Sequence, residues 1–137
     1  MLHPNTFEFL TGLKNNNNKP WFDANRPAYE AAKTDIVRFV ETLVAGLSRV
    51  DAPVAEAGLL AKACLSRLHR DVRFSANKSP YKTNFFAFIS PGGRKSNQAG
   101  YYLQLEPGGS FAGGGVYMPE AEELARFRQE IDFNWGE

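Results

Sequence analysis

The chain has 137 residues, of which 43% are hydrophobic and 23% charged, and its formal net charge is +1. This length and composition fit one globular domain with a substantial core. They exclude a protein that coats polyanions as histones do, because the net charge is too weak for general attraction. Any electrostatic role must therefore come from a local cluster of charges.

Neither the start of the chain nor its cysteine content indicates export or membrane insertion. The first residues, MLHPNTFEFL, lack a basic region followed by an apolar stretch, and no apolar run approaches a membrane span. The one cysteine, Cys64, cannot form an internal disulfide, so we expect a cytoplasmic protein with no membrane partner. Because Cys64 lies in the apolar-rich stretch LLAKACLSRL, we interpret it as a packed small hydrophobe and not as a nucleophile.

The N-terminal third of the chain predicts two helices. The first, PNTFEFLTGLK, would be capped by Asn5 or Thr6, and the NNNN tetrad at 15–18 would follow as a loop. The second covers about 23–50, with Asp23 or Asn25 as N-cap and Pro27 in its first turn. Trp21 and Phe22 would pack the intervening loop onto the core. The apolar stripes expected to face that core are Phe9, Leu10 and Leu13, then Ile36, Val40, Leu43, Val44 and Leu47.

The pattern then changes from helical spacing to alternation. ACLSRLHRDVRF, residues 63–74, has apolar side chains at even positions, which predicts a half-buried strand that bends or ends near Arg70. TNFFAFIS, YYLQLE and SFAGGGVY predict three more strands joined by turns, and PEAEELARFRQEI predicts a last helix. Strands that follow one another through short turns favour an antiparallel meander. The predicted class is therefore α+β, one domain over residues 1–137, with helices on one face of the sheet.

A basic cluster at residues 67–84 is the strongest candidate for a site. Two strand ends and the loop SANKSP between them could gather guanidinium and ammonium groups around one hollow. Asp71 would pair with Arg70 or Arg73 and hold that guanidinium in place, and Arg26 could add a further charge. The alternative is a solvated charged loop. The predicted ligand-binding residues are Arg67, Arg70, Asp71, Arg73, Lys78, Tyr81, Lys82 and Asn84.

This cluster predicts binding of a small phosphorylated or carboxylated ligand. One alternative is single-stranded nucleic acid, stacked on Phe85, Phe86, Tyr101 and Tyr102, and it ranks second because alternation should turn half of these rings into the core. A further alternative is a scaffold without ligand, in which Asp71, Glu106 and the acidic last helix neutralise the cluster internally. The sequence leaves the oligomeric state open.

No motif identifies a catalyst, a metal or a cofactor. One cysteine and two histidines do not make a transition-metal ligand set, so we predict no metal and no cofactor. The glycine-rich stretch EPGGSFAGGGVY does not match a phosphate-binding loop, and it indicates a bulge or a tight backbone contact. A missing side chain there could also clear room for a ligand. His69, Asp71 and Tyr81 could transfer protons, but whether the protein is an enzyme is open.

Three long blocks resemble the bacterial and fungal family called domain of unknown function 2461. They are LKNNNNKPWFDANRPAYE, RLHRDVRFSANKSPYKTN and AGYYLQLEPGGSFAGGGVYMPE, in the family's order. The resemblance implies an α+β domain and a cytoplasmic protein, and it gives no residue a chemical role. Family members usually continue past the last helix, so it also implies a chain shortened at its C-terminus. The family's pattern corresponds here to Asn16, Asn17, Trp21, Phe22, Arg70, Asp71, Arg73, Phe74, Lys78, Pro80, Tyr81 and Lys82.

Overall fold

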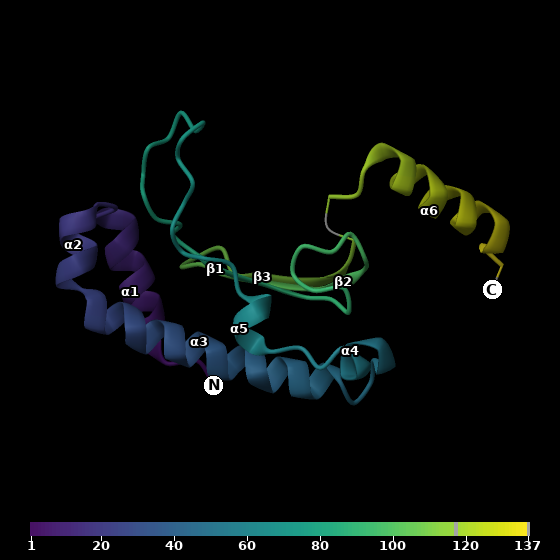
Figure 1. Cartoon of the computed structure of the whole chain (residues 1–137), viewed down its shortest axis with the longest axis horizontal. Coiled ribbons are helices and arrows are strands. Elements are labelled where there is room, and N and C mark those ends of the chain that lie inside the picture. Colours follow the sequence, from purple (N-terminus) through teal and green to yellow (C-terminus); the bar gives the residue numbers. More distant parts are fainter. Residues whose placement is uncertain (117, 137) are drawn as a thin grey trace.

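A three-stranded antiparallel sheet lies on a layer of helices (Figure 1). The computed structural model describes residues 1–116 and 118–136. The helices and strands in them are α1 (Pro4–Asn15), α2 (Lys19–Ala24), α3 (Arg26–Leu47), α4 (Ala52–Glu56), α5 (Ala61–Cys64), β1 (Phe85–Ile89), β2 (Gly100–Leu105), β3 (Phe111–Gly115) and α6 (Ala121–Asn134). The predicted α+β class with an antiparallel meander is confirmed.

Helix α1 begins at Pro4, before both of the residues predicted to cap it. Its N-cap is His3, whose ring accepts a hydrogen bond from the Asn5 amide at 3.3 Å. Pro4 suits the first turn, since it needs no hydrogen-bond partner for a main-chain N–H group. The prediction of Asn5 or Thr6 as cap is wrong, because Thr6 is buried and donates its hydroxyl to Asp35 at 2.6 Å. The predicted stripe of α1 is confirmed as buried, and consists of Phe9, Leu10 and Leu13.

The segment between the two predicted helices is itself a helix, α2, and not a loop. Asn18 caps it by accepting a hydrogen bond from the Trp21 amide at 3.0 Å. Phe22 is buried in the core, as expected. Asn25 is the N-cap of α3, but its side chain donates back to the Trp21 carbonyl at 2.9 Å. Asn25 is therefore both the C-cap of α2 and the N-cap of α3.

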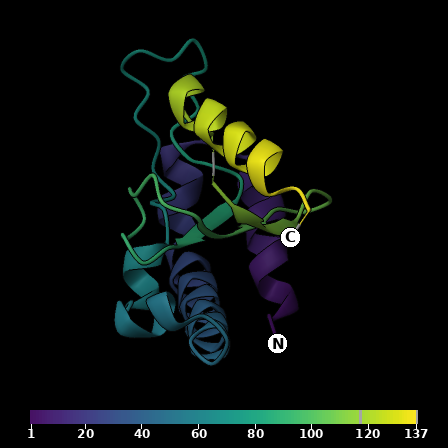
Figure 2. The same ribbon diagram turned by 90° about the vertical axis from the view of Figure 1, so that its right-hand side faces the viewer.

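Each side of the sheet has its own set of side chains. Ala87 of β1 pairs with Leu103 of β2, and both face α3 and α5. The opposite side, here called the outer face, carries Phe86, Phe88, Tyr102, Gln104 and Phe111. Figure 2 shows α3 on one side of the sheet and α6 on the other. Helices α1 to α5 therefore lie on one side, as predicted, and α6 does not.

Helix α6 extends away from the end of the sheet (Figures 1 and 2). A capping box between Glu120 and Glu123 closes its N-terminus. The predicted stripe of Leu124, Phe127 and Ile131 exists, but these side chains are 36%, 43% and 65% exposed. Among the residues described, no helix has the length and apolar character needed to cross a membrane.

The strand predicted for residues 63–74 is wrong. Cys64 closes the short helix α5, and residues 65–74 form two isolated bridges, Leu65 with Ala87 of β1 and His69 with Tyr81, but no continuous strand. Apolar and polar residues therefore alternate along this stretch because one side of an extended chain faces the core. The stretch does not form a continuous ladder of hydrogen bonds with another strand. The strand predicted at 110–117 is β3, and its Tyr117 lies outside the described residues.

Candidate functional site

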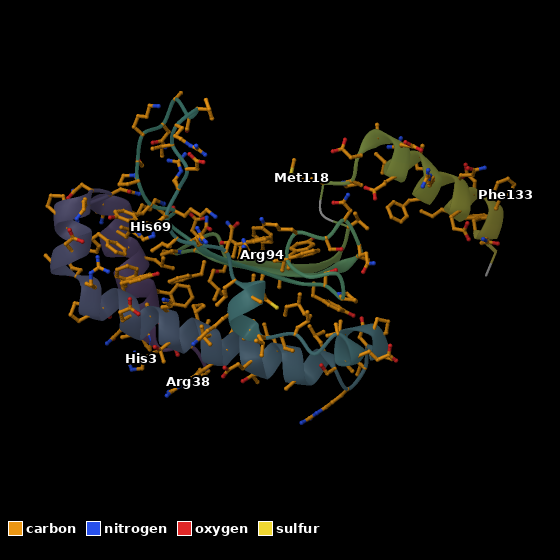
Figure 3. All side chains as sticks on the ribbon, viewed as in Figure 1. His3, Arg38, His69, Arg94, Met118 and Phe133 are labelled. Atoms are coloured by element: carbon orange, nitrogen blue, oxygen red, sulfur yellow. The ribbon has the colours of Figure 1, made fainter. Side chains whose placement is uncertain are left out.

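A short two-stranded ribbon, formed by residues 68–70 and 80–82, supports the predicted site. The Arg70 amide donates to the Pro80 carbonyl at 2.9 Å, and the Lys82 amide donates to the Leu68 carbonyl at 2.8 Å. Beyond the ribbon, residues 71–79 form a loop that projects from the protein (Figure 1). Figure 3 labels His69 at the base of this loop. The ribbon therefore fixes the ends of the loop, where Arg70 and Lys82 lie.

Tyr81 is the anchor of the ribbon. Its ring is buried and stacks on Phe22 with 4.2 Å between centroids and 13° between planes. Asn17 holds its main chain, because the carboxamide accepts from the Tyr81 amide at 3.1 Å and donates to the Tyr81 carbonyl at 2.9 Å. The α1–α2 turn and the ribbon are thereby joined at a fixed distance.

This junction creates a cavity of about 340 Å³, here called the basic pocket. Lys14 comes from the last turn of α1, and Arg70 and Lys82 come from the ribbon. No residue that lines the basic pocket carries a carboxylate. The principal lining residues are Lys14, Asn17, Arg70, Tyr81, Lys82 and Asn84. Four of the eight residues predicted for the site therefore meet in one hollow.

The basic pocket has an excess of positive charge. Burial lowers the pKa of the Lys82 ammonium below its ordinary value, and the nearby charges of Arg94 and Arg70 lower it further. Figure 3 shows Arg94 over the outer face of the sheet. In the described part of the chain, neither Lys14, Arg70, Lys82 nor Arg94 forms an ion pair. These four cations therefore have no internal counterion among the described residues.

Arg70 is held by its own loop. One guanidinium nitrogen donates to the Ser79 carbonyl at 3.1 Å and the other donates to the Ser75 hydroxyl at 3.3 Å. Both acceptors are neutral, so these bonds position the guanidinium without cancelling its charge. Arg70 is therefore a preorganised cation at the edge of the basic pocket.

Three predicted residues lie in the projecting loop and do not line the basic pocket. Asp71 and Arg73 form an ion pair of 2.6 Å whose side chains are 61% and 76% exposed, and this pairing lowers the pKa of Asp71. Lys78 donates to the Val72 carbonyl at 2.9 Å. These bonds hold the loop itself together. The expectation that Asp71 pairs with an arginine is confirmed, but the pair does not shape the pocket.

Arg67 lies at a different cavity. It lines, with His69, a cleft of about 230 Å³ between α3, the stretch 65–69 and β1. Arg26 is also elsewhere, since it pairs with Asp23 at 3.0 Å and lies over the Phe22 ring. The single cluster expected from the sequence is therefore divided between two cavities and an exposed loop.

Sequence reasoning missed Lys14 and Arg94 and gave Asn17 only a turn role. Lys14 belongs to α1 and Arg94 to the turn after β1, and no local pattern connects either residue with the ribbon. The asparagine tetrad was a usable signal, because four adjacent amides exceed what one turn needs. Three of the four have different roles: Asn16 ends α1, Asn17 holds Tyr81 and Asn18 caps α2.

The outer face is only partly available to a ligand. A Cβ on Gly113 would lie 2.6 Å from the Tyr102 ring, so this glycine allows a tight contact within the sheet. The Tyr102 ring fills the space that a ligand would have used. Of the four rings predicted to stack bases, Phe85 is buried, and Tyr101 faces the helices and donates its hydroxyl to Asp51 at 2.9 Å.

Two further observations concern reactive groups. Cys64 is buried, as expected, and burial raises the pKa of its thiol. Within residues 1–116 and 118–136, no group of three or more His, Cys, Asp or Glu side chains is placed to hold a metal ion.

Glu106 accepts hydrogen bonds from Thr83 and Gln104, and α6 forms its ion pair internally between Arg126 and Glu122. Neither neutralises the basic pocket.

Comparison with known proteins identifies the family and nothing more specific. A family model described as "Conserved hypothetical protein (DUF2461)" matches residues 5–137, essentially the whole chain. No curated protein matches, and no solved structure matches. The matched range contains all three blocks that carry the resemblance, together with the ribbon and the basic pocket. The chain belongs to the family of conserved hypothetical proteins called DUF2461.

Proposed function

We propose that the basic pocket binds a small anionic ligand that carries a phosphate or a carboxylate. The observation that supports this proposal most directly is the convergence of Lys14, Arg70 and Lys82 on one cavity whose lining has no carboxylate. Like charges held together without a counterion destabilise a fold, and an anion in the cavity would relieve that repulsion. The proposal concerns binding and does not assign a reaction.

The chemistry of the lining suits such a ligand. Arg70 presents a planar set of donors that matches two oxygens of a phosphate or carboxylate, and Lys82 adds a point charge. Amides of Asn17 and Asn84 line the same cavity. A volume of about 340 Å³ lies at the small end of the range known for ligand pockets, about 300–1,000 Å³. The ligand is therefore expected to be a small metabolite.

Isothermal titration with inorganic phosphate and with citrate tests the proposal. Arg70→Gln and Lys82→Gln should each weaken binding about tenfold or more, because each removes a charge-assisted hydrogen bond. Arg49→Gln removes an exposed positive charge just beyond α3 and should leave the affinity unchanged. Absence of binding to both anions, or equal affinities in all three variants, would contradict the proposal.

Single-stranded nucleic acid is a second candidate, supported by one feature of the outer face. Phe111 is 47% exposed, and its ring meets Tyr102 edge to face at 6.1 Å between centroids. Bases stack on such rings, and basic residues nearby would hold phosphates. Fluorescence anisotropy with labelled oligouridine would show binding that falls steeply with salt and weakens in Phe111→Ala. Binding that is independent of salt and of Phe111 would exclude this candidate.

A further inference from the structure

A second cavity is lined in part by the stretch of chain that leads into the ribbon. This cavity, here called the α3 cleft, is the 230 Å³ space between α3, the stretch 65–69 and β1. It shares no lining residue with the basic pocket. A ligand in the α3 cleft would therefore touch none of the residues that line the basic pocket.

The floor of the α3 cleft is apolar and rigid. Ile36, Val37, Leu68 and Phe85 line it, and all four are core residues no more than 8% exposed. Side chains buried to this extent are held in position by close packing with their neighbours, so the floor does not depend on a ligand for its shape. Apolar lining of this kind favours a ligand with an apolar part.

The rim of the α3 cleft is cationic. Lys62 and Arg67 are exposed at its edge, and in the described part of the chain neither forms an ion pair. Lys33 also lines the cleft, with its ammonium 3.9 Å from Glu30 and 5.6 Å from the centre of the Tyr29 ring. An exposed pair at that distance contributes little, so the rim keeps a net positive charge.

We infer that the α3 cleft binds a small amphipathic carboxylate, with its apolar or aromatic tail on the floor and its carboxylate at Arg67. The guanidinium of Arg67 offers two parallel donors, the geometry that a planar carboxylate accepts. Lys62 and Lys33 add charge on the same side. The tail distinguishes this ligand from the small hydrophilic anion proposed for the basic pocket, whose lining is polar.

A buried hydroxyl beside Arg67 supports this inference. Ser66 Oγ is buried and, among the described residues, has no hydrogen-bond partner. Buried polar atoms without partners are uncommon, and each calls for a cause. Ser66 is also one of the residues that line the α3 cleft. A turn about its χ1 would let the hydroxyl donate to a bound carboxylate, which would satisfy it.

An NMR titration of the 15N-labelled protein with 4-phenylbutyrate tests the inference. We expect saturable shifts confined to amides of the α3 segment 29–37 and of the stretch 65–69. The neutral analogue 4-phenylbutanol should bind about tenfold more weakly, because the charge-assisted bonds are lost. Arg67→Gln should weaken phenylbutyrate binding to a similar extent. Arg67 is exposed, so this variant should fold normally, which its own spectrum will show.

Two matched controls separate this site from the basic pocket. Arg49→Gln, an equal loss of charge elsewhere, should bind phenylbutyrate as the unmodified protein does. Lys82→Gln should also bind it normally, although it should weaken phosphate binding. Equal affinity for the alcohol and the acid, no effect of Arg67→Gln, or shifts confined to residues 70–82 and α1 would overturn the inference. Each of these outcomes leaves the proposal for the basic pocket unaffected.

Discussion

The carboxamide of Asn17 is hydrogen-bonded to both main-chain polar groups of Tyr81, which lies 64 residues later in the chain. This pair joins the α1–α2 turn to the ribbon and brings Lys14 to the same cavity as Arg70 and Lys82. An amide side chain is suited to this task because it can accept and donate at once. Asn17 is therefore a positioning residue for the basic pocket.

Asn17→Ala should destabilise the protein and weaken anion binding together. The substitution leaves the partly buried amide and carbonyl of Tyr81 without partners, at a cost of about 1–3 kcal/mol. Urea denaturation measures this loss, and phosphate titration measures the change in affinity. Asn16→Ala is the control, since it removes an exposed side-chain bond to the Gly12 carbonyl and should cost less. Equal losses of stability and of phosphate affinity in both variants would show that Asn17 does not position the basic pocket.

Lys82 should lower stability at neutral pH. Its folded-state pKa lies below the unfolded value, so its charge opposes folding wherever both states are protonated. As pH rises through the lowered folded pKa toward the unfolded value of about 10.4, the unfolded state binds more protons and stability recovers. Lys82→Met should therefore be more stable than the unmodified protein at pH 7, and the advantage should shrink at pH 10.

Denaturation midpoints at both pH values measure this effect. Lys95→Met removes an exposed lysine from the turn after β1 and serves as the control, with little change expected at either pH. Lys82→Met should also bind phosphate more weakly, so that stability and binding change in opposite directions. A loss of stability at pH 7 would show that the ammonium is already neutralised within the fold.

Cys64 should react only when the protein unfolds. It is the last residue of α5 and is buried in a cluster with Ala87 of β1, so reagents cannot reach it. Burial also raises the pKa of its thiol, so little thiolate is present. Ellman's reagent should label it slowly in buffer and rapidly in denaturant. Cys64→Ser should cost about 1–3 kcal/mol, because it buries a hydroxyl among apolar side chains. Rapid labelling of the folded protein would contradict this account.

Gly113→Ala should destabilise the sheet. A Cβ at this position would lie 2.6 Å from the Tyr102 ring, and relieving that overlap costs about 1–3 kcal/mol. Gly109→Ala is the matched control in the preceding turn, where the nearest atom to a Cβ is 3.7 Å away, and it should change stability by less than about 0.5 kcal/mol. Thermal unfolding of the two variants checks the difference.

Local pattern was a reliable guide to the larger elements. Helical spacing in α1 and α3 and alternation in β2 are confirmed because one face of each element packs on the core, and the aromatic-rich run at β1 is confirmed as a strand. The same reasoning failed at residues 63–74, where alternation occurs without a strand ladder. It also missed α2, a six-residue helix, because so short an element has too few residues to show a period.

The candidate site was predicted only in part, because side-chain directions, like short helices, leave no local pattern in the sequence. Arg70, Tyr81, Lys82 and Asn84 meet because the ribbon pairs their segments, and that pairing is close in sequence. Arg67 and Arg73 are equally close in sequence, yet one faces the α3 cleft and the other the solvent. Nearness along the chain makes it easier for charges to meet, but the direction of each side chain depends on packing.

The α+β class, helices α1 and α3, the antiparallel order of the strands and the presence of a basic segment could all be predicted from the amino-acid sequence. Those features follow from the periods of apolar residues and from turn chemistry, which act over a few residues. Tertiary packing, in contrast, places Lys14 beside Arg70 and Lys82 and places Arg67 at another cavity. These choices depend on bonds such as that of Asn17 to Tyr81, because partners distant along the chain leave no local pattern.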